Sequence, residues 1–314
     1  MWKISKGERG IMLKKRILVI SWFYPPVNSS EGLVTYKLLK ASKNNYDVFT
    51  QKNNALWSYG NKNELPDSEN VKPIFAKSKK LEDWVAEAVD YYTKNSEKYD
   101  IIMTRSMPPE SHKIGLKIKK INPKVKWIAS FGDPIADNPY TKIAIECSSP
   151  HSVKTCTKFR GIISPKRIIR NAMFKIRYIK IQKTYLGENS KLQKSIISNA
   201  DYLLFNSNEQ KEYMLGEENK DKKSIVLNHS FDQSLYPKEK EEHKKIEFNY
   251  VGHLDAIRTP KKLFEAINEL NPDLIIIGGR QAEDIDSFKE IAPTVNLAVD
   301  GQDYMNSFKT VVTD

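Results

Sequence analysis

Cysteine is scarce in this 314-residue chain, which holds only Cys147 and Cys156. The two form no C-x-x-C pair, and no cluster of histidine and cysteine has the spacing of a zinc site. We therefore interpret them as two reduced thiols in a reducing compartment. The sequence predicts neither a disulfide framework nor a metal site.

Long apolar runs are also lacking, and no stretch approaches the ~20 residues that a membrane-spanning helix needs. The apolar run Ile17–Ile20 follows a basic stretch, as the apolar part of a signal peptide does. However, two prolines come after it, and it is not followed by a cleavage site of small residues. We interpret this run as a buried strand and expect the natural domain to start at Met12. With 39% hydrophobic residues, the chain is long enough for a sizeable core and about two domains.

Three common nucleotide and hydrolase motifs are missing. The first expected strand is followed by SWFYPPVNSSEG, whereas a dinucleotide needs G-x-G-x-x-G so that the backbone can approach the pyrophosphate. The chain has no G-x-x-x-x-G-K-[ST] and no G-x-S-x-G. The sequence therefore argues against a nicotinamide enzyme, a P-loop kinase or ATPase, and a hydrolase with a nucleophile elbow.

Strands alternate with helices along most of the chain. Strands are expected at 17–21, 46–50, 99–104, 126–130, 200–205 and 224–227, and again at 247–251, 274–277 and 295–299. Residues 51–79 are expected to be irregular, and a helix is expected at 81–92. Ser207 and Gln210 together predict a capping box at the start of another helix. The pattern predicts an α/β fold of two parallel sheets divided by the charged linker at 238–245. Ligands of such folds bind outside the carboxyl ends of the strands.

Six segments stand in order at the ends of expected strands: RILVISWFYPP, DIIMTRSMPPESHKIG, WIASFGDP, ADYLLFNSNEQKEYM, VLNHSFD and FNYVGHLDAIRTPKKLFEAI. Together they resemble family 4-type glycosyltransferases of the GT-B fold, over about 16–300. The resemblance implies two Rossmann-like domains: an acceptor-side domain at 12–236, with a basic helical insertion at about 141–198, and a partial nucleotide-sugar-binding domain at 246–314. It also implies transfer of a sugar from a nucleotide-sugar to a cell-surface polysaccharide precursor, with retention of configuration and with no metal or other cofactor.

The resemblance places the donor-phosphate site in two loops. Gly252 is followed by His253 and, at the sixth position, by Arg258, with Lys262 in the next helix. Arginine suits a bidentate phosphate contact, whereas His253 stands where the family has a basic residue and is fully charged only when protonated. Gly32 matches the glycine whose backbone approaches the phosphates, and Ser29, Ser30 and Glu31 are expected to line the same loop. The alternatives are a solvated helix start for the cations and an ordinary turn glycine for Gly32.

The resemblance places two residues on the acceptor side. His112, at a helix start in PPESH, is expected to face the cleft, and Asp133 in FGDP is expected to orient or deprotonate an acceptor hydroxyl. The family has arginine where Gly132 stands, so one charge is missing. A structural histidine and a turn aspartate are the alternatives, and we interpret His229, which replaces a family glycine, as structural.

The chain is basic, with 51 Lys+Arg against 39 Asp+Glu and a formal charge of +12. Residues 151–183 carry many cations and no acidic residue, and apolar residues recur there at helical spacing. This pattern predicts a helix lying on an anionic membrane surface, so we expect a cytoplasmic protein at the inner face of the membrane, with a lipid-linked saccharide as a possible acceptor. A packed helix with a solvated basic back is the alternative. The cations assigned to the membrane are Lys166, Arg167, Arg170, Lys175, Arg177 and Lys180.

The family's donor domain carries a pair of glutamates that hold the donor sugar, and no such pair follows Gly278. We therefore expect a second domain that stops part-way. We expect this incomplete domain to lower or abolish the transferase activity. Two other functions stay open: a non-catalytic relative that binds a membrane or a partner, and a basic nucleic-acid-binding α/β protein. No aromatic-interleaved platform accompanies the charge, so no nucleic-acid partner is expected.

Overall fold

The computed structural model describes residues 16–27, 29–52, 68–136, 138, 173, 176, 179–180, 182–183, 187–229, 247–251, 266 and 273–277. The chain divides into two compact units, one of 1–58 with 62–230 and one of 59–61 with 231–314. The boundary expected at 236–246 lies outside the described residues.

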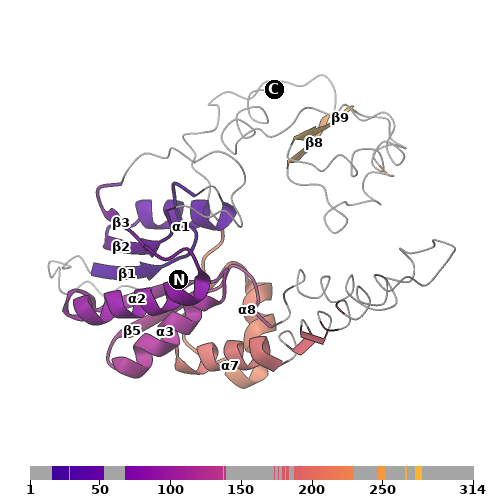
Figure 1. Ribbon diagram of the computed structural model, residues 1–314. Helices are drawn as coiled ribbons and strands as arrows, with labels where there is room; N and C mark the ends of the chain where they lie inside the picture. The colour runs from indigo at the N-terminus through magenta and orange to yellow at the C-terminus, as the bar shows by residue number, and fades with distance from the viewer. Residues whose placement is uncertain are drawn as a thin grey trace, which may run out of the picture. The chain divides into compact units, whose positions relative to one another are not determined.

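The first unit is built on a seven-stranded parallel sheet in the order β3-β2-β1-β4-β5-β6-β7. Helix α1 lies on one face of this sheet, and α2, α3 and α7 lie on the other (Figure 1). The strands are β1 (Arg16–Ile20), β2 (Asn45–Thr50), β3 (Val71–Phe75), β4 (Ile101–Arg105), β5 (Lys126–Ser130), β6 (Tyr202–Phe205) and β7 (Ser224–Val226). The helices are α1 (Ser30–Lys40), α2 (Leu81–Asn95), η1 (Ser96–Lys98), α3 (Glu110–Ile121), α7 (Asn189–Asn199), α8 (Asn208–Leu215) and η3 (Glu217–Asn219).

Burial on both faces explains the short apolar strands that the sequence shows. In β1, Ile17 and Val19 pack on the α1 side, whereas Leu18 and Ile20 pack on the side of α2 and α3. Alternate side chains of a strand point to opposite faces, so a strand covered on both faces must be apolar throughout. The predicted α/β class with parallel strands is confirmed.

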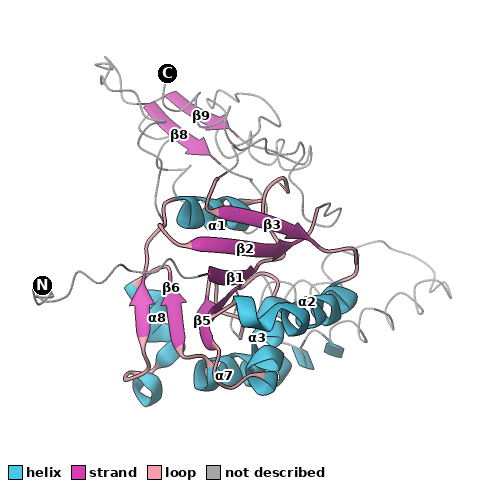
Figure 2. Cartoon of the chain, turned by 90° about the vertical axis from the view of Figure 1, so that its left-hand side faces the viewer, coloured by secondary structure: helices cyan, strands magenta, loops and turns pink. Residues whose placement is uncertain are grey.

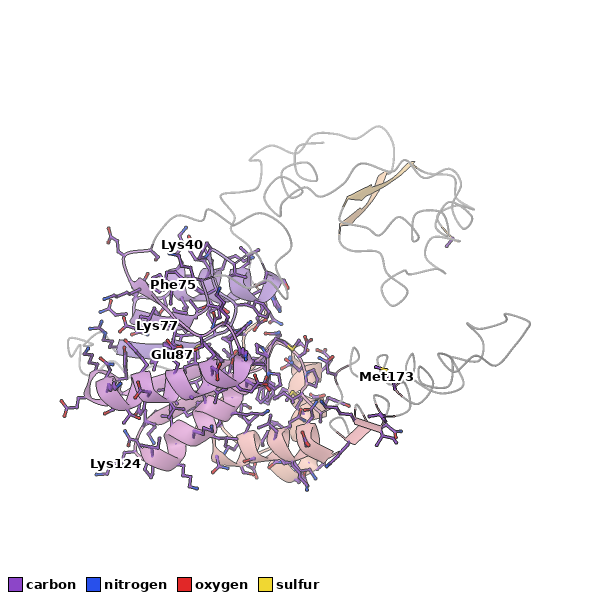
Figure 3. All side chains as sticks on the ribbon, viewed as in Figure 1. Lys40, Phe75, Lys77, Glu87, Lys124 and Met173 are labelled. Atoms are coloured by element: carbon purple, nitrogen blue, oxygen red, sulfur yellow. The ribbon has the colours of Figure 1, made fainter. Side chains whose placement is uncertain are left out.

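One strand was not expected. Residues 51–79 were predicted to be irregular, but β3 pairs with β2 at the sheet edge, with Pro73 opposite Val48. Proline has no N–H to donate, so it is unfavourable within a sheet but tolerated in an edge strand. Its presence in the sequence therefore argued against the strand that the structure contains. The connection from β3 to α2 is fixed by Glu87, whose carboxylate accepts hydrogen bonds from the backbone N–H groups of Lys77 and Ser78, at 2.8 and 2.9 Å (Figure 3).

The second unit is described at two parallel strands, β8 (Glu247–Val251) and β9 (Asp273–Ile277). Both fall where strands were predicted. Figure 2 shows the described strands and helices of each unit. Among the described residues, no helix combines the length and the hydropathy that crossing a membrane requires.

Candidate functional site

Charged and polar side chains gather at the carboxyl edge of the seven-stranded sheet. Arg105 ends β4, Gly132 and Asp133 follow β5, and His229 follows β7, while Glu31 lies in the first turn of α1, after β1. We call Glu31, Arg105, Asp133 and His229 the carboxyl-edge cluster. This is the edge at which ligands of parallel α/β sheets bind.

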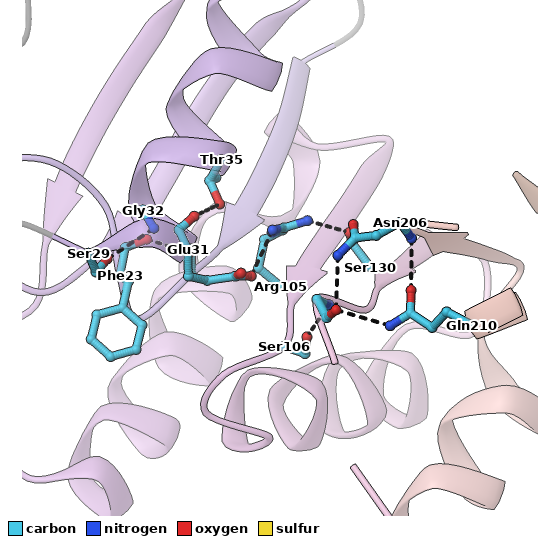
Figure 4. A network of polar contacts seen from close by, with 12 residues as sticks. Phe23, Ser29, Glu31, Gly32, Thr35, Arg105, Ser106, Ser130, Asn206 and Gln210 are labelled. Atoms are coloured by element: carbon cyan, nitrogen blue, oxygen red, sulfur yellow. Dashed lines mark hydrogen bonds and ion pairs between the residues drawn. The ribbon is translucent and has the colours of Figure 1, made fainter. Parts of the chain in front are cut away.

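The centre of the cluster is a buried ion pair between Glu31 and Arg105 (Figure 4). Arg105 Nη2 lies 2.7 Å from Glu31 Oε1, and the two side chains are 2% and 15% exposed. Arg105 Nη1 donates to Ser130 Oγ at 2.7 Å. Arg105 Nη2 and Glu31 Oε1 thus satisfy each other as an ion pair, whereas Arg105 Nε has no hydrogen-bond partner among the described residues.

The pKa of Glu31 is raised above its ordinary value. Burial has the largest effect, because it disfavours the carboxylate, and the nearby charge of Asp133 adds to it. The charge of Arg105 acts in the opposite direction. The pKa of His229 is lowered by burial and by the positive charges of Arg105 and Lys37, and Asp133 opposes this. Arg105 and Asp133 thus influence the pKa values of both Glu31 and His229 at one edge of the sheet.

Gly32 is used for packing and for capping the helix. Its N–H donates to Ser29 Oγ at 3.0 Å, which makes Ser29 the N-cap of α1. A Cβ on Gly32 would meet Ser29 Oγ at 2.9 Å and the backbone of Tyr24 at 3.3 Å. Close approach of two backbone segments thus requires glycine here. The phosphate contact predicted for Gly32 stays a prediction, and it would need a group other than this N–H.

The loop that carries Asp133 is held on both sides. Gly132 N–H donates to Ser106 Oγ at 2.6 Å, and Gly132 O accepts from Asn206 Nδ2 and Gln210 Nε2 at 2.9 and 3.0 Å (Figure 4). Further along, the N–H groups of residues 135 and 136 donate to Gln193 Oε1 at 2.9 and 3.0 Å. Asp133 itself is exposed. The structure therefore presents this predicted acceptor-side carboxylate to solvent from a fixed loop.

The capping box predicted for α8 is present in altered form. Ser207 Oγ accepts from Gln210 N at 3.1 Å, as predicted. The Gln210 side chain, however, accepts from Asn206 N at 2.8 Å and donates to Gly132 O. This glutamine thus links the helix start to the site loop.

Arg105 places a positive charge near position 132, where the resemblance led us to expect an arginine. A Cβ on Gly132 would lie 2.9 Å from Glu31 Oε2, so Glu31 occupies the space beside this glycine. Sequence reasoning did not single out Arg105. The available signal was a charged residue ending a strand whose last four residues are buried.

His112 does not face the cleft as expected, because the ring is 0% exposed. Its Nδ1 lies 2.7 Å from Thr104 Oγ1, which also accepts from Trp127 Nε1 at 2.9 Å, and its ring packs 4.8 Å from that of Phe131. Burial, with the charge of Arg105, lowers the pKa of His112 to about 3. The imidazole is therefore neutral at physiological pH, and its Nε2 has no hydrogen-bond partner among the described residues.

The remaining predicted site residues lie largely outside the described residues. These are the donor-phosphate residues Gly252, His253, Arg258 and Lys262, and the basic residues Lys166, Arg167, Arg170, Lys175 and Arg177. Lys180 is described and exposed. The described part of the chain contains no group of three or more His, Cys, Asp or Glu placed to hold a metal ion.

Comparisons with known proteins point to the fold. No family model matches the chain. The lipopolysaccharide outer core galactosyltransferase WaaB in its apo form is 14% identical, with a TM-score of 0.50 over 90% of this chain and 67% of that chain. A structure described as trehalose-6-phosphate from E. coli, bound with UDP-2-fluoro glucose, is 10% identical, with a TM-score of 0.51 over 94% of this chain and 76% of that chain. The chain thus has the fold of GT-B glycosyltransferases, as the resemblance implied.

One curated protein matches a short segment. The petrobactin-binding protein YclQ of Bacillus subtilis is 53% identical over 47 residues. The match covers 15% of this chain and 15% of that protein. It leaves most of both chains outside the similarity.

Proposed function

We propose that this chain transfers a sugar from a nucleotide-sugar to a saccharide acceptor. The observation that carries the proposal is the carboxyl-edge cluster, which a GT-B fold places at the ligand-binding edge of its first sheet. Asp133, exposed on a fixed loop, is the residue proposed to orient or deprotonate the acceptor hydroxyl.

The donor is proposed to be held by the other unit. Arg258, with His253 or Lys262, would offset the charge of the departing diphosphate in the loop after Gly252, so that no metal is required. UDP-sugars are the first donors to test, because the E. coli structure of the same fold holds UDP-2-fluoro glucose. Retention of configuration and a polysaccharide precursor as acceptor belong to this proposal as expectations from the family.

Calorimetric titration of the chain with UDP, GDP and ADP tests donor binding, and release of nucleoside diphosphate from the matching nucleotide-sugar tests transfer. Arg258→Gln is expected to weaken diphosphate binding about tenfold or more, because a charge-assisted bidentate contact is lost. Lys124→Gln is the control, since Lys124 is an exposed cation at the amino edge of the sheet. Excess EDTA is expected to leave turnover unchanged. Binding without any turnover would favour the non-catalytic alternative, and no binding of any nucleotide would contradict the proposal.

A second proposal is that residues 151–183 bind an anionic membrane surface. The specific observation is that Met173, Ile176 and Ile179, all helical, are 65%, 68% and 63% exposed. Apolar residues at this spacing, in a stretch whose only charged residues are Lys and Arg, suit a helix lying at the lipid interface. A cytoplasmic protein at the inner face of the membrane, acting on a lipid-linked saccharide, would follow.

Co-sedimentation with phosphatidylglycerol vesicles at low salt tests the membrane proposal. We expect retention on these vesicles, loss on phosphatidylcholine vesicles, and loss in the Ile176→Glu variant. The wild-type chain remaining in the supernatant with anionic vesicles would contradict it. Salt-sensitive retention on DNA, without nucleotide binding, would instead support the nucleic-acid alternative.

A further inference from the structure

The amino end of α1 carries an anion of its own. Glu31 lies in the first turn of the helix, where the free N–H groups and the helix dipole stabilise a negative charge. Of the N–H groups there, that of Gly32 is already bonded to Ser29 Oγ. A phosphate approaching this end would meet the Glu31 carboxylate and the Asp133 carboxylate that influences it. With Arg105 already paired to Glu31, the two carboxylates favour a neutral hydrogen-bond donor over a diphosphate at this end of the helix.

We propose that Glu31 is an acceptor-binding carboxylate that receives a hydroxyl of a saccharide, and that Arg105 is the residue that positions it. This inference rests on the proposed function, because it assigns the acceptor to the carboxyl-edge cluster and the diphosphate elsewhere. It adds a second carboxylate to the acceptor side, beside Asp133.

The geometry fixes the Glu31 side chain from three directions. Arg105 Nη2 holds one carboxylate oxygen at 2.7 Å, and Arg105 is itself held by Ser130. Gly132 leaves room for the other oxygen, which a Cβ at that position would approach to 2.9 Å. The backbone of Glu31 is fixed in α1, where its carbonyl accepts from Thr35 Oγ1 at 2.8 Å. The carboxylate is thus pre-organised.

The carboxylate also has unused hydrogen-bonding capacity. A carboxylate accepts hydrogen bonds at both oxygens and donates none. Arg105 takes Oε1, which is buried, so the second oxygen, Oε2, is the one left for a ligand. Its side chain is 15% exposed, whereas Arg105 is 2% exposed. A ligand at this edge would therefore reach Glu31 and not Arg105. A saccharide hydroxyl, which is neutral and donates a hydrogen bond, fits this position.

The test compares the binding of saccharides and of UDP in the whole chain. Saturation-transfer NMR measures binding of methyl glycosides of glucose, galactose, mannose and N-acetylglucosamine, and calorimetry measures binding of UDP. In Glu31→Gln we expect saccharide binding to fall about ten- to a hundred-fold, because a hydrogen bond to a charged acceptor is lost, with UDP binding unchanged within about twofold. Arg105→Gln should show the same loss. Arg105→Lys should recover part of the saccharide binding, because lysine keeps a positive charge beside Glu31, and UDP binding should stay unchanged in both Arg105 variants, which a general loss of structure would not predict.

The matched control is Asp47→Asn. Asp47 is also a buried carboxylate paired with an arginine, Arg16, but that arginine begins β1 and so lies at the amino edge of the sheet. This control is expected to lose stability and keep saccharide binding. Glu31→Asp, which retains the charge, is a second variant to use if Glu31→Gln does not fold. It should weaken saccharide binding and keep the wild-type affinity for UDP.

Equal saccharide binding by the wild type and Glu31→Gln would overturn the inference. So would a wild-type chain that binds none of the methyl glycosides. Tighter UDP binding in Glu31→Gln would also overturn it, because the loop would then face the donor. Failure of the proposed function looks different, since the wild-type chain would then bind none of the nucleotides tested.

Discussion

At the scale of single residues, the site depends on what surrounds each charge. Asp133 and Glu31 are both carboxylates at one sheet edge, yet Asp133 is exposed and Glu31 is largely buried against Arg105. His112, only seven positions from Arg105 in the sequence, is sealed in the core and kept neutral. The residue types suggested the chemistry, whereas burial decides which groups are charged and which can be reached.

Gly132 provides a test of the Glu31 position. In Gly132→Ala the new Cβ would lie 2.9 Å from Glu31 Oε2, so the carboxylate must shift. We expect methyl glycoside binding to fall several-fold in saturation-transfer NMR, with a loss of about 1–3 kcal/mol in the free energy of unfolding. Gly187→Ala is the control, because its Cβ would meet nothing within 4 Å. Unchanged glycoside binding in Gly132→Ala would show that the position of Glu31 does not matter.

His112 predicts a pH dependence of stability. The folded-state pKa of about 3 lies below the ordinary 6.5, so the unfolded chain binds the proton more tightly. Stability contributed by the neutral ring is therefore complete above about pH 6.5 and is lost as the pH falls toward 3. Urea unfolding of the wild type and of His112→Gln from pH 8 to pH 4 measures this, and the gap between them should narrow on acidification. Glu31, whose pKa is raised, acts in the opposite sense in both proteins and so cancels in the comparison. A gap that is constant with pH would contradict a neutral, buried ring.

At the scale of helices and strands, ion pairs join elements at the opposite, amino edge of the sheet. Asp201, just before β6, is 2.7 Å from Lys119 Nζ on α3 and 3.2 Å from Lys126 Nζ on β5, and it accepts from Trp127 N–H at 2.9 Å. These contacts lower the pKa of Asp201 although partial burial opposes them. One carboxylate thus links three neighbouring elements.

Replacing Asp201 by Asn should destabilise the first unit by about 1–3 kcal/mol, because charge-assisted hydrogen bonds are lost. Since the folded-state pKa is lowered, the wild-type advantage is present above the unfolded-state pKa and disappears as the pH falls through the folded value. Chemical unfolding at pH 7 and at low pH measures both effects. Asp90→Asn is the control, because the Asp90–Lys94 pair is 59% and 70% exposed and should contribute little. Equal effects of the two substitutions would contradict this account.

The sequence allowed most strands to be predicted, for a physical reason. The strand at 17–20 is buried on both faces, and most of the strand at 126–130 is covered as well, so their apolar runs are local signals. β3 was missed because its pairing with β2 depends on a neighbour distant in the sequence and its proline is unfavourable for a strand. The Glu31–Arg105 pair was missed for the same reason, since only the register of β1, β4 and β5 brings these residues together. The pairing of distant residues was thus the part that local patterns could not supply.

At the scale of the whole molecule, the two hydrophobic clusters of the described residues both belong to the first unit. One lies between the sheet and α2, α3, α7 and α8, and the other lies between the sheet and α1. Large buried aromatic residues, among them Trp84 and Trp127, fill the first of them. Such a unit has the two covered faces that a parallel sheet needs in order to be stable by itself.

We therefore expect a fragment of residues 1–230 to fold on its own. Burial of apolar area inside one unit is the main stabilising contribution. Both hydrophobic clusters are formed by residues before position 230. Thermal unfolding of the fragment should be cooperative, with a midpoint within about 5 °C of that of the first transition of the whole chain. The fragment should retain Glu31-dependent binding of methyl glycosides and should lose UDP binding, because the residues proposed to hold the diphosphate lie at 252–262. UDP binding by the fragment at wild-type affinity would place the donor in the first unit and would contradict the division of roles between the two units.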